Sequence, residues 1–415
     1  MNRVHRHTRS AVLGLLALSG LALVAAPSAR SATGAMWWLW VFAGILACTL
    51  PVESSSPAQR GAARVWWLTA LAGLVLSLLG ALVWQERFRV VEAEARLALG
   101  ALAAAWLAGH LAHARVARWA LHATALACVV AAGVATFTEG RALPSNAIPW
   151  AAGVACLVAV LAPRAIDRWK SADSRARPWE KWLWAVGVGA GLAAVLLSRS
   201  RGAFGLVLLL VLLPSALDAV RGGLNAARLA RSAALIALAA AALAATAWLP
   251  QDPLRVRAGW EQMTHPTQRP QDTELGSRML LWGMAWDGIR ESPWIGHGQN
   301  ELRARIHEEA TRARSAHFGG LAHAHSEYLN AWFAHGLPGL LGVLLPMVGL
   351  AVMAWRLRRE DAVAALQLAG LFAIHASTSL TNANLAHQLY AALLSTGAAI
   401  ALVGVRGGDD GNDDS

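Results

Sequence analysis

Long apolar runs separated by short polar islands make up most of this chain. Each run is close to the roughly 20 residues that a helix needs to cross a bilayer, and none alternates apolar and polar residues as a membrane β-strand would. Twelve runs qualify, at approximately residues 11–27, 35–51, 65–84, 97–113, 118–137, 147–163, 182–197, 203–219, 232–249, 336–355, 362–380 and 385–404. The pattern predicts an all-α integral membrane protein of about twelve transmembrane helices.

One long polar stretch, residues 250–335, divides these runs and predicts four parts. Residues 1–249 hold the first nine spans, residues 250–335 form a large helical loop domain, and residues 336–405 hold the last three spans. The acidic residues 406–415 are expected to form a disordered tail. The first span also has the features of a secretory signal peptide, because basic residues precede it and small residues follow it. Its cleavage and its retention both remain open.

Charge sets the orientation of the predicted spans. Only 15% of the 415 residues are charged, against about 25% in soluble domains, and the mean hydropathy is +0.43. Twenty lysines and arginines fall on short segments on the side of the N-terminus, and seven on short segments opposite. This bias predicts that both termini are cytoplasmic and that residues 250–335 lie outside. The net charge of +11 then reflects orientation and contact with anionic membrane lipids, and not nucleic-acid binding.

The polar hinge SRSRGAFG, residues 198–205, carries two arginines between two spans on the predicted outer side. Arg199 and Arg201 therefore stand against the orienting bias. One interpretation is that they reach lipid headgroups as interfacial anchors. The other is a clamp for phosphate, because guanidinium groups bind phosphate oxygens in pairs.

The outer loop opens with GSRMLLWGMAWDGIRE, residues 276–291, whose spacing predicts an amphipathic helix. Ser277 is the expected N-cap, and Pro293 with Gly296 ends the helix. Its apolar stripe is expected to lie on the membrane or to pack against the spans; it consists of Met279, Trp282, Gly283, Trp286 and Ile289. Arg278, in the first turn, is then held near the membrane plane, although a solvated surface charge is the alternative. Residues 299–316 alternate acids and bases and predict a second helix with a solvated face.

LAHAHSEYLN, residues 321–330, holds the third group of candidate residues. His323 and His325 share a face only in an extended segment. An H-x-H pair can bind a metal, but no further acid or cysteine pattern completes such a site. A histidine also suits general-base chemistry near neutral pH. The other candidates here for supporting the site are Ser326, Glu327 and Asn330.

Together these segments resemble the O-antigen ligase family, a superfamily that also includes O-antigen polymerases and O-linked oligosaccharyltransferases. The resemblance rests on SRSRGAFG, on GSRMLLWGMAWDGIRESPWIGHG and on HAHSEYLNAWFAHGLPGLLG, in that order. It implies transfer of a glycan from undecaprenyl pyrophosphate to an acceptor at the periplasmic face of the bacterial inner membrane. In ligases the acceptor is a sugar hydroxyl of lipid A–core. It also implies inverting catalysis without metal or cofactor, on a fold similar to multi-span glycosyltransferases with lipid-linked donors (GT-C-like).

Residue by residue, the resemblance implies that Arg201 and Arg278 bind the pyrophosphate, with Arg199 as a neighbour, and that His325 is the general base. Ser326 stands where the family often has asparagine, so a hydroxyl replaces the amide there. The chemistry agrees, because arginines stabilise the charge that develops on a pyrophosphate leaving group.

The alternatives are an O-antigen polymerase, a protein O-oligosaccharyltransferase and, in another class, a transporter of the same lipid-linked glycan. A transporter would place charges along a midplane pathway, whereas here the ionisable residues gather at the edges of the spans.

Overall fold

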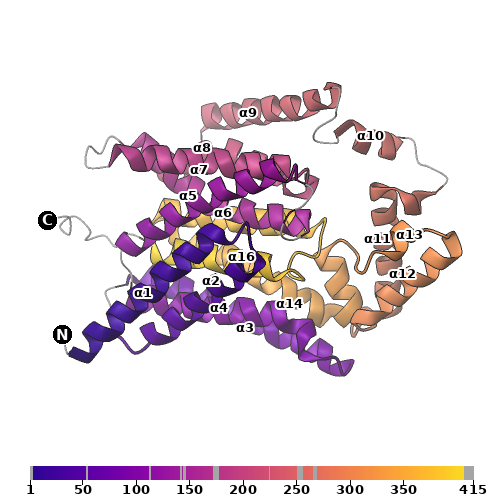
Figure 1. Cartoon of the computed structure of the whole chain (residues 1–415), viewed down its shortest axis with the longest axis horizontal. Coiled ribbons are helices and arrows are strands. Elements are labelled where there is room, and N and C mark those ends of the chain that lie inside the picture. Colours follow the sequence, from indigo (N-terminus) through magenta and orange to yellow (C-terminus); the bar gives the residue numbers. More distant parts are fainter. Residues whose placement is uncertain are drawn as a thin grey trace.

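The computed structural model describes residues 3–52, 55–111, 114–140, 143, 146–171, 177–223, 225–249, 256–264 and 269–405. Every predicted span coincides with a helix of this part of the chain (Figure 1). These helices are α1 (Arg3–Ala25), α2 (Arg30–Ala47), α3 (Pro57–Val83), α4 (Glu92–His110), α5 (Ala114–Phe137), α6 (Ala147–Lys170), α7 (Pro178–Leu197), α8 (Gly205–Gly222), α9 (Ala226–Ala245), α14 (Glu327–Leu357), α15 (Ala362–Ser379) and α16 (Gln388–Val403). The predicted tail at 406–415 lies outside the described residues.

Nine of the helices described are long and apolar enough to cross a membrane by themselves. The three other predicted spans, α2, α4 and α16, do not meet that standard. Helix α4 has Glu92, Glu94 and Arg96 in its first five residues, and α16 is only 16 residues long. The all-helical, multi-span prediction is therefore confirmed for the described residues, with nine spans of sufficient length and apolarity where twelve were expected.

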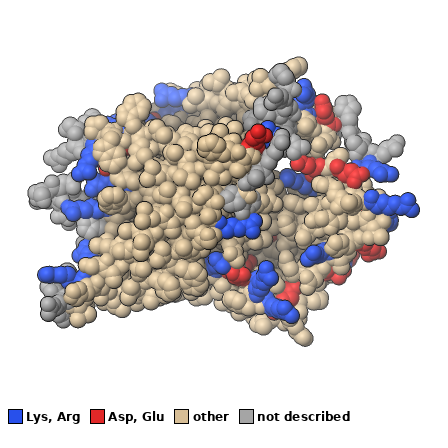
Figure 2. All heavy atoms as spheres, viewed as in Figure 1, with Lys and Arg blue, Asp and Glu red and all other residues tan. Residues whose placement is uncertain are grey.

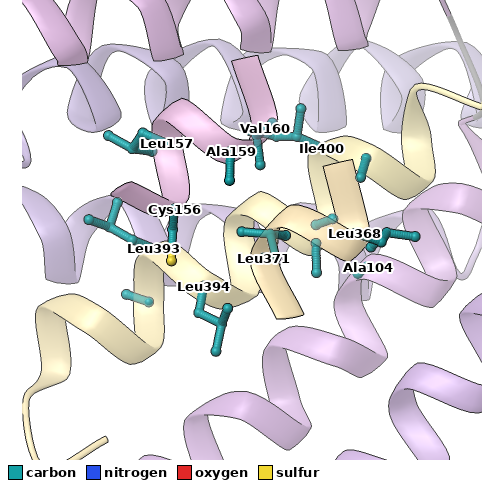
Figure 3. Close-up of a cluster of buried hydrophobic side chains, with 14 of the residues drawn as sticks. Ala104, Cys156, Leu157, Ala159, Val160, Leu368, Leu371, Leu393, Leu394 and Ile400 are labelled. Carbon is teal, nitrogen blue, oxygen red and sulfur yellow. The ribbon is translucent and has the colours of Figure 1, made fainter. Parts of the chain in front are cut away.

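The core of the bundle is built around α6, whose apolar stretch is almost entirely enclosed by other helices. Figure 3 shows α6 side chains such as Cys156 and Val160 meeting Leu371 of α15 and Leu393 of α16. Small residues bring other helices into close contact: a Cβ atom on Gly44 of α2 would lie 2.6 Å from Cα of Ala103 in α4. Lipid offers no hydrophobic force between helices, so such close packing stabilises the bundle.

Helix α9 is the exception, because none of its residues is buried, and its main helical neighbour among the described residues is α8 (Figure 1). Figure 2 shows a broad belt of uncharged residues across the middle of the molecule, with charged residues gathered toward its two ends.

A second, smaller cluster of helices lies at the end of the bundle where α3, α7 and α15 finish, which we call the site end (Figure 1). It consists of α10 (Val256–Thr264), α11 (Glu274–Glu291), α12 (Gln299–Ala313) and α13 (Ala316–Gly319). Its apolar core joins Leu281 of α11, Ile306 of α12 and Phe318 of α13 to Phe333 of α14. The polar stretch of the sequence thus folds into helices with a core of their own.

Helix α11 begins earlier than predicted, and Ile289 is the one residue of its predicted apolar stripe that is buried. It begins at Glu274 with Thr273 as the N-cap, so Ser277 is not the cap but is buried one turn inside the helix. The packed face is also different: its buried residues are Ser277, Leu281, Ala285, Gly288 and Ile289. Met279 and Trp286 remain exposed. Small residues allow the close approach at this interface, because a Cβ atom on Gly288 would collide with the Phe333 ring.

Helix α14 is 31 residues long and kinks at His335 and Gly336, whose backbone is not helical. The kink interlocks with the segment between α11 and α12. The His297 N–H donates to the Phe333 carbonyl oxygen (2.9 Å) and the Gly298 N–H to that of Ala334 (2.8 Å). The His335 Nε2 atom also lies 2.7 Å from Glu86 Oε2, just beyond the end of α3. These contacts fix the small helical cluster to the bundle.

Candidate active site

The two histidines of the H-x-H segment lie in the non-helical stretch that leads into α14. Their rings are 4.4 Å apart, centre to centre, and the backbone N–H of His325 donates to His323 Nδ1 (3.2 Å). His325 has a positive φ of 49°, a conformation that is uncommon for side chains other than glycine and that clusters at functional sites. The segment is therefore bent, and the bend turns both rings to the same place.

Ser326 and Glu327 anchor this stretch to the bundle. Ser326 is the buried N-cap of α14, and its hydroxyl accepts from the Leu329 N–H. Glu327 is also buried, and its Oε2 atom accepts from the Leu385 N–H (2.8 Å) in the loop between α15 and α16. Asn330 accepts from the Ala324 N–H through Oδ1 (3.4 Å). These three residues hold the backbone on either side of His325.

The surroundings of His325 favour a neutral imidazole. Burial lowers the pKa of His325 to about 3, and the nearby His323, Arg278 and His317 lower it further, while the Asn382 side chain acts in the opposite direction. Burial likewise lowers the pKa of His323 to about 4, with a further contribution from His387. An imidazole that stays uncharged at neutral pH has a free lone pair with which to accept a proton.

Arg278 extends from the second turn of α11 and is half-buried. It is close enough to His325 to lower the pKa of that imidazole electrostatically. The structure thus brings the predicted loop arginine and the predicted base together, although 47 positions separate them in the sequence.

The arginine hinge reaches the same place through its backbone. A Cβ atom on Gly202 would lie 2.5 Å from Thr381 Oγ1, and one on Gly205 would lie 3.0 Å from Ser377 Oγ. Arg201 begins the short 3₁₀ turn at 201–203, and its side chain lies outside the described part of the structure. Arg199 is exposed and has a positive φ of 54°. The hinge therefore packs against the end of α15, one residue from Asn382, which contacts His325.

The loop of residues 381–384, which we call the TNAN loop, was missed in the sequence. Asn382 and Asn384 are fully buried and bonded to one another, with Asn382 Nδ2 donating to Asn384 Oδ1 (2.9 Å). The only signal for them is a run of polar residues, TNAN, between two apolar spans. Buried amides at the end of a membrane helix are costly unless they are satisfied, which marks the run as structured.

Most arginines of α12 are committed to ion pairs, in line with the predicted solvated face. Arg305 pairs with Glu291 (2.8 Å) and Glu301 (3.0 Å), and Arg312 pairs with Glu309. As for metals, no three histidine, cysteine, aspartate or glutamate side chains converge in the described parts of the chain.

The arrangement can bind an anion and accept a proton at one place. Arg278 supplies positive charge, His325 supplies a neutral imidazole, and the backbone of the hinge packs close by. All three are at the site end, where α14 begins and where the helical cluster meets the bundle.

A comparison with known proteins finds a family match over the part of the chain that contains these residues. Residues 186–344, from α7 to the first half of α14, match a family model described as O-antigen ligase. An uncharacterized protein of Haemophilus influenzae is 32% identical over 78 residues, which is 18% of this chain and 19% of that protein. The chain thus spans about a fifth of the length of that curated relative. The family match includes the hinge, Arg278 and His325, but ends before the TNAN loop.

Proposed function

Because this chain belongs to the O-antigen ligase family through its residues 186–344, we propose that it transfers a glycan from undecaprenyl pyrophosphate to a sugar hydroxyl of lipid A–core. The observation that carries the proposal is the meeting of His325, Arg278 and the arginine hinge at the site end. The donor is anionic and the acceptor must lose a proton, which are the two needs that these residues meet.

The donor pyrophosphate binds at Arg278 and at the hinge. Guanidinium groups suit this role because their planar N–H donors pair with phosphate oxygens. Arg201 and Arg278 stabilise the negative charge that develops on the leaving pyrophosphate, and Arg199 supports them from the edge. Preorganised charge of this kind is often the largest contribution to catalysis.

His325 then acts as the general base in a single displacement. Its neutral imidazole takes the proton of the acceptor hydroxyl while that oxygen forms a bond to the anomeric carbon of the glycan. The bond from this carbon to the pyrophosphate oxygen breaks, and undecaprenyl pyrophosphate leaves with the electron pair. Attack opposite the leaving group inverts the anomeric carbon, and no step needs a metal or cofactor.

The pyrophosphate also makes His325 a better base. A pKa of about 3 in the free protein makes the imidazole a weak proton acceptor. A bound dianion beside it raises that pKa, because an opposite charge favours imidazolium. Donor binding would therefore switch on the base only when the leaving group is in place.

The proposed setting is the periplasmic face of the inner membrane, with both termini in the cytoplasm. The asymmetry of lysine and arginine between the short loops supports it. In this arrangement residues 250–335 form a periplasmic domain that carries Arg278 and His325, and membrane lipids surround residues 1–249 and 336–405.

A reconstituted reaction tests the activity. Purified protein is incubated with undecaprenyl-pyrophosphate-linked glycan and lipid A–core in EDTA, without nucleotide, and we expect lipopolysaccharide of higher mass. Longer lipid-linked polymer would instead indicate a polymerase, and glycan on protein an oligosaccharyltransferase. Absence of any product, with movement of the glycan into vesicles, would indicate a transporter.

Site variants test the roles of the residues. Removing one well-placed hydrogen-bond donor to the developing charge lowers the rate by about 10²–10³-fold. We expect a loss of this size for Arg201→Ala and for Arg278→Ala. His325→Ala should lose about 10²–10⁴, the usual contribution of a general base. The matched control is Arg303→Ala, on the exposed face of α12, which should keep full activity. Normal O-antigen attachment by any of the three site variants, in cells that lack the native enzyme, would refute the role assigned to that residue.

A further inference from the structure

The tautomer of His325 depends on what contacts each of its two ring nitrogens. A general base needs one ring nitrogen with a lone pair, so the other must carry the proton, and a hydrogen bond to that other nitrogen decides which is which. In many enzymes a carboxylate provides this bond. Here the nearest acid in sequence, Glu327, is committed to the Leu385 N–H. The group that lies against the imidazole is the Asn382 amide.

The orientation of the Asn382 amide follows from a chain of hydrogen bonds that starts in α15. The Thr378 hydroxyl donates to the Ile374 carbonyl oxygen (2.7 Å), so its proton is used and its oxygen must accept. Asn384 Nδ2 donates to that oxygen (2.8 Å). The amide of Asn384 is thereby fixed, with Oδ1 facing the other way.

The next step fixes Asn382. Its Nδ2 atom donates to Asn384 Oδ1 (2.9 Å), which leaves Oδ1 as the atom available to His325. Both Asn382 Oδ1 and His325 Nδ1 are buried, and neither makes another hydrogen bond to the described residues. The Asn382 side chain interacts with the imidazole, but no regular hydrogen bond joins the two in the free protein, as is common for catalytic groups before substrate binds.

We propose that Thr378, Asn384 and Asn382 form a one-way chain of hydrogen bonds that holds His325 protonated on Nδ1 and leaves the Nε2 lone pair for the acceptor hydroxyl. An amide oxygen accepts but does not donate, so the reverse tautomer would leave two buried acceptors facing each other. Asn382 is thus a positioning residue for His325. The proposal rests on the proposed function only in assigning His325 as the base.

The tautomer itself can be measured without turnover. Protein labelled with ¹⁵N-histidine in detergent micelles is compared with a His325→Gln sample, which identifies the His325 signals. We expect a protonated Nδ1 and an unprotonated Nε2 at pH 7. In Asn382→Leu, which has a similar size and no polar atoms, the preference for Nδ1–H should disappear. An Nε2–H tautomer in the wild type, or an unchanged Nδ1–H tautomer in Asn382→Leu, would overturn the proposal.

Kinetics provide the second readout. For Asn382→Leu we expect kcat to fall by about 10²-fold, within the contribution of a positioned base, with KM unchanged. Asn382→Asp keeps the acceptor and should recover much of kcat. Its carboxylate also favours imidazolium, so the acid limb of kcat/KM should move to higher pH. The other groups that face His325 are His323, Arg278 and His317, and they are the same in all variants.

Thr378→Val tests the start of the chain if Asn382→Leu does not fold. It keeps the side-chain shape but removes the oxygen that orients Asn384, so His325 should show a mixture of tautomers. Thr396→Val is the matched control, because Thr396 is a buried threonine of α16 whose hydroxyl has no partner among the described residues. It should change neither the tautomer nor kcat. A wild type without ligase activity would refute the proposed function, but the NMR result would still decide the tautomer.

Discussion

Burial gives His325 a lower pKa than that of an ordinary general base. A general base is most efficient when its pKa is near the working pH, whereas burial holds the pKa of His325 at about 3. Its protonated form is therefore the one that the folded protein disfavours. In the proposed mechanism the charge of the bound donor compensates for this, so base strength depends on the occupant of the site.

This difference predicts an unusual pH dependence. The profile of kcat/KM reports the free enzyme, and that of kcat the substrate complex. Because His325 is already neutral above about pH 4 in the free protein, kcat/KM should show no loss near pH 6.5. The acid limb of kcat should lie at higher pH than that of kcat/KM. Both profiles are measured by ligation assays from pH 5 to 8, and a half-loss of kcat/KM between pH 6 and 7 would contradict the prediction.

At the scale of elements, two glycines allow the kink of α14 and the segment after α11 to interlock. Gly336 has φ 63° and ψ −155°, a region that is essentially restricted to glycine. A Cβ atom there would collide with the Trp294 carbonyl group. Gly296 also has a positive φ, and a Cβ atom on it would lie 2.5 Å from the Ala334 carbonyl oxygen. Neither side of the junction has room for a larger residue.

We therefore expect Gly336→Ala to loosen the helical cluster from the bundle. Backbone strain of this kind costs about 1–3 kcal/mol, and the cluster carries Arg278. Limited proteolysis should cut within residues 270–320 faster than in the wild type, and ligation should fall even though the bundle stays folded.

Gly283→Ala is the control for this variant. Gly283 lies in α11, and a Cβ atom on it meets nothing within 4 Å. Alanine favours helix over glycine by about 0.8–1 kcal/mol, so this change should be neutral or stabilising. Equal protease resistance of Gly336→Ala and wild type would show that the interlock does not hold the cluster in place.

The helices of the bundle could be predicted from the sequence, but the packing of α11 could not. Hydropathy was enough to locate every helix of the bundle, because a span must be long and apolar whatever it contacts. The face of α11 that packs against other helices shares Ile289 with the predicted apolar stripe, whereas large apolar residues of the stripe, such as Met279 and Trp286, are exposed. The real interface needs close approach, and it is made by Ser277, Ala285 and Gly288.

The TNAN loop could not be recognised as part of the candidate site for a different reason. Its role depends on contact with His325, which is 57 positions earlier in the chain, and no local pattern encodes such a contact. Arg278 and His325 were found because their segments resemble a known family. Asn382 lies beyond the matched residues, so only the fold shows that it belongs to the site.

At the scale of the whole molecule, the site end and the opposite end are built differently. At the opposite end, Arg164 of α6 pairs with Asp361, the N-cap of α15 (2.9 Å), and also donates to the Gly404 carbonyl oxygen (2.6 Å). The N-terminus lies at this end too (Figure 1). These ionic contacts join helix ends, whereas at the site end Arg305 of α12 pairs with Glu291 and Glu301, and His335 of α14 contacts Glu86.

The proposed orientation, with the site end in the periplasm and the opposite end in the cytoplasm, can be tested by labelling single cysteines. Single cysteines are introduced after Cys48, Cys128 and Cys156 are replaced by serine. Arg303→Cys, on α12, should react in intact cells with a thiol reagent that does not cross the inner membrane. Arg359→Cys, at the opposite end, should react only after the membrane is permeabilised. Both positions are exposed arginines, so they form a matched pair, and the reverse pattern of labelling would invert the proposed orientation.

The kink of α14 has a consequence for the lipid that surrounds the protein. The 21 residues from Leu337 to Leu357 extend about 31 Å at 1.5 Å per residue, which is close to the roughly 30 Å hydrocarbon thickness of a bilayer. If Leu337–Leu357 crosses the hydrocarbon layer, the residues before the kink lie in the headgroup layer, where the proposed donor carries its phosphates. Under the proposed function this position would hold His325 at the depth of the donor phosphates, so we expect the rate of ligation to depend on the thickness of the bilayer.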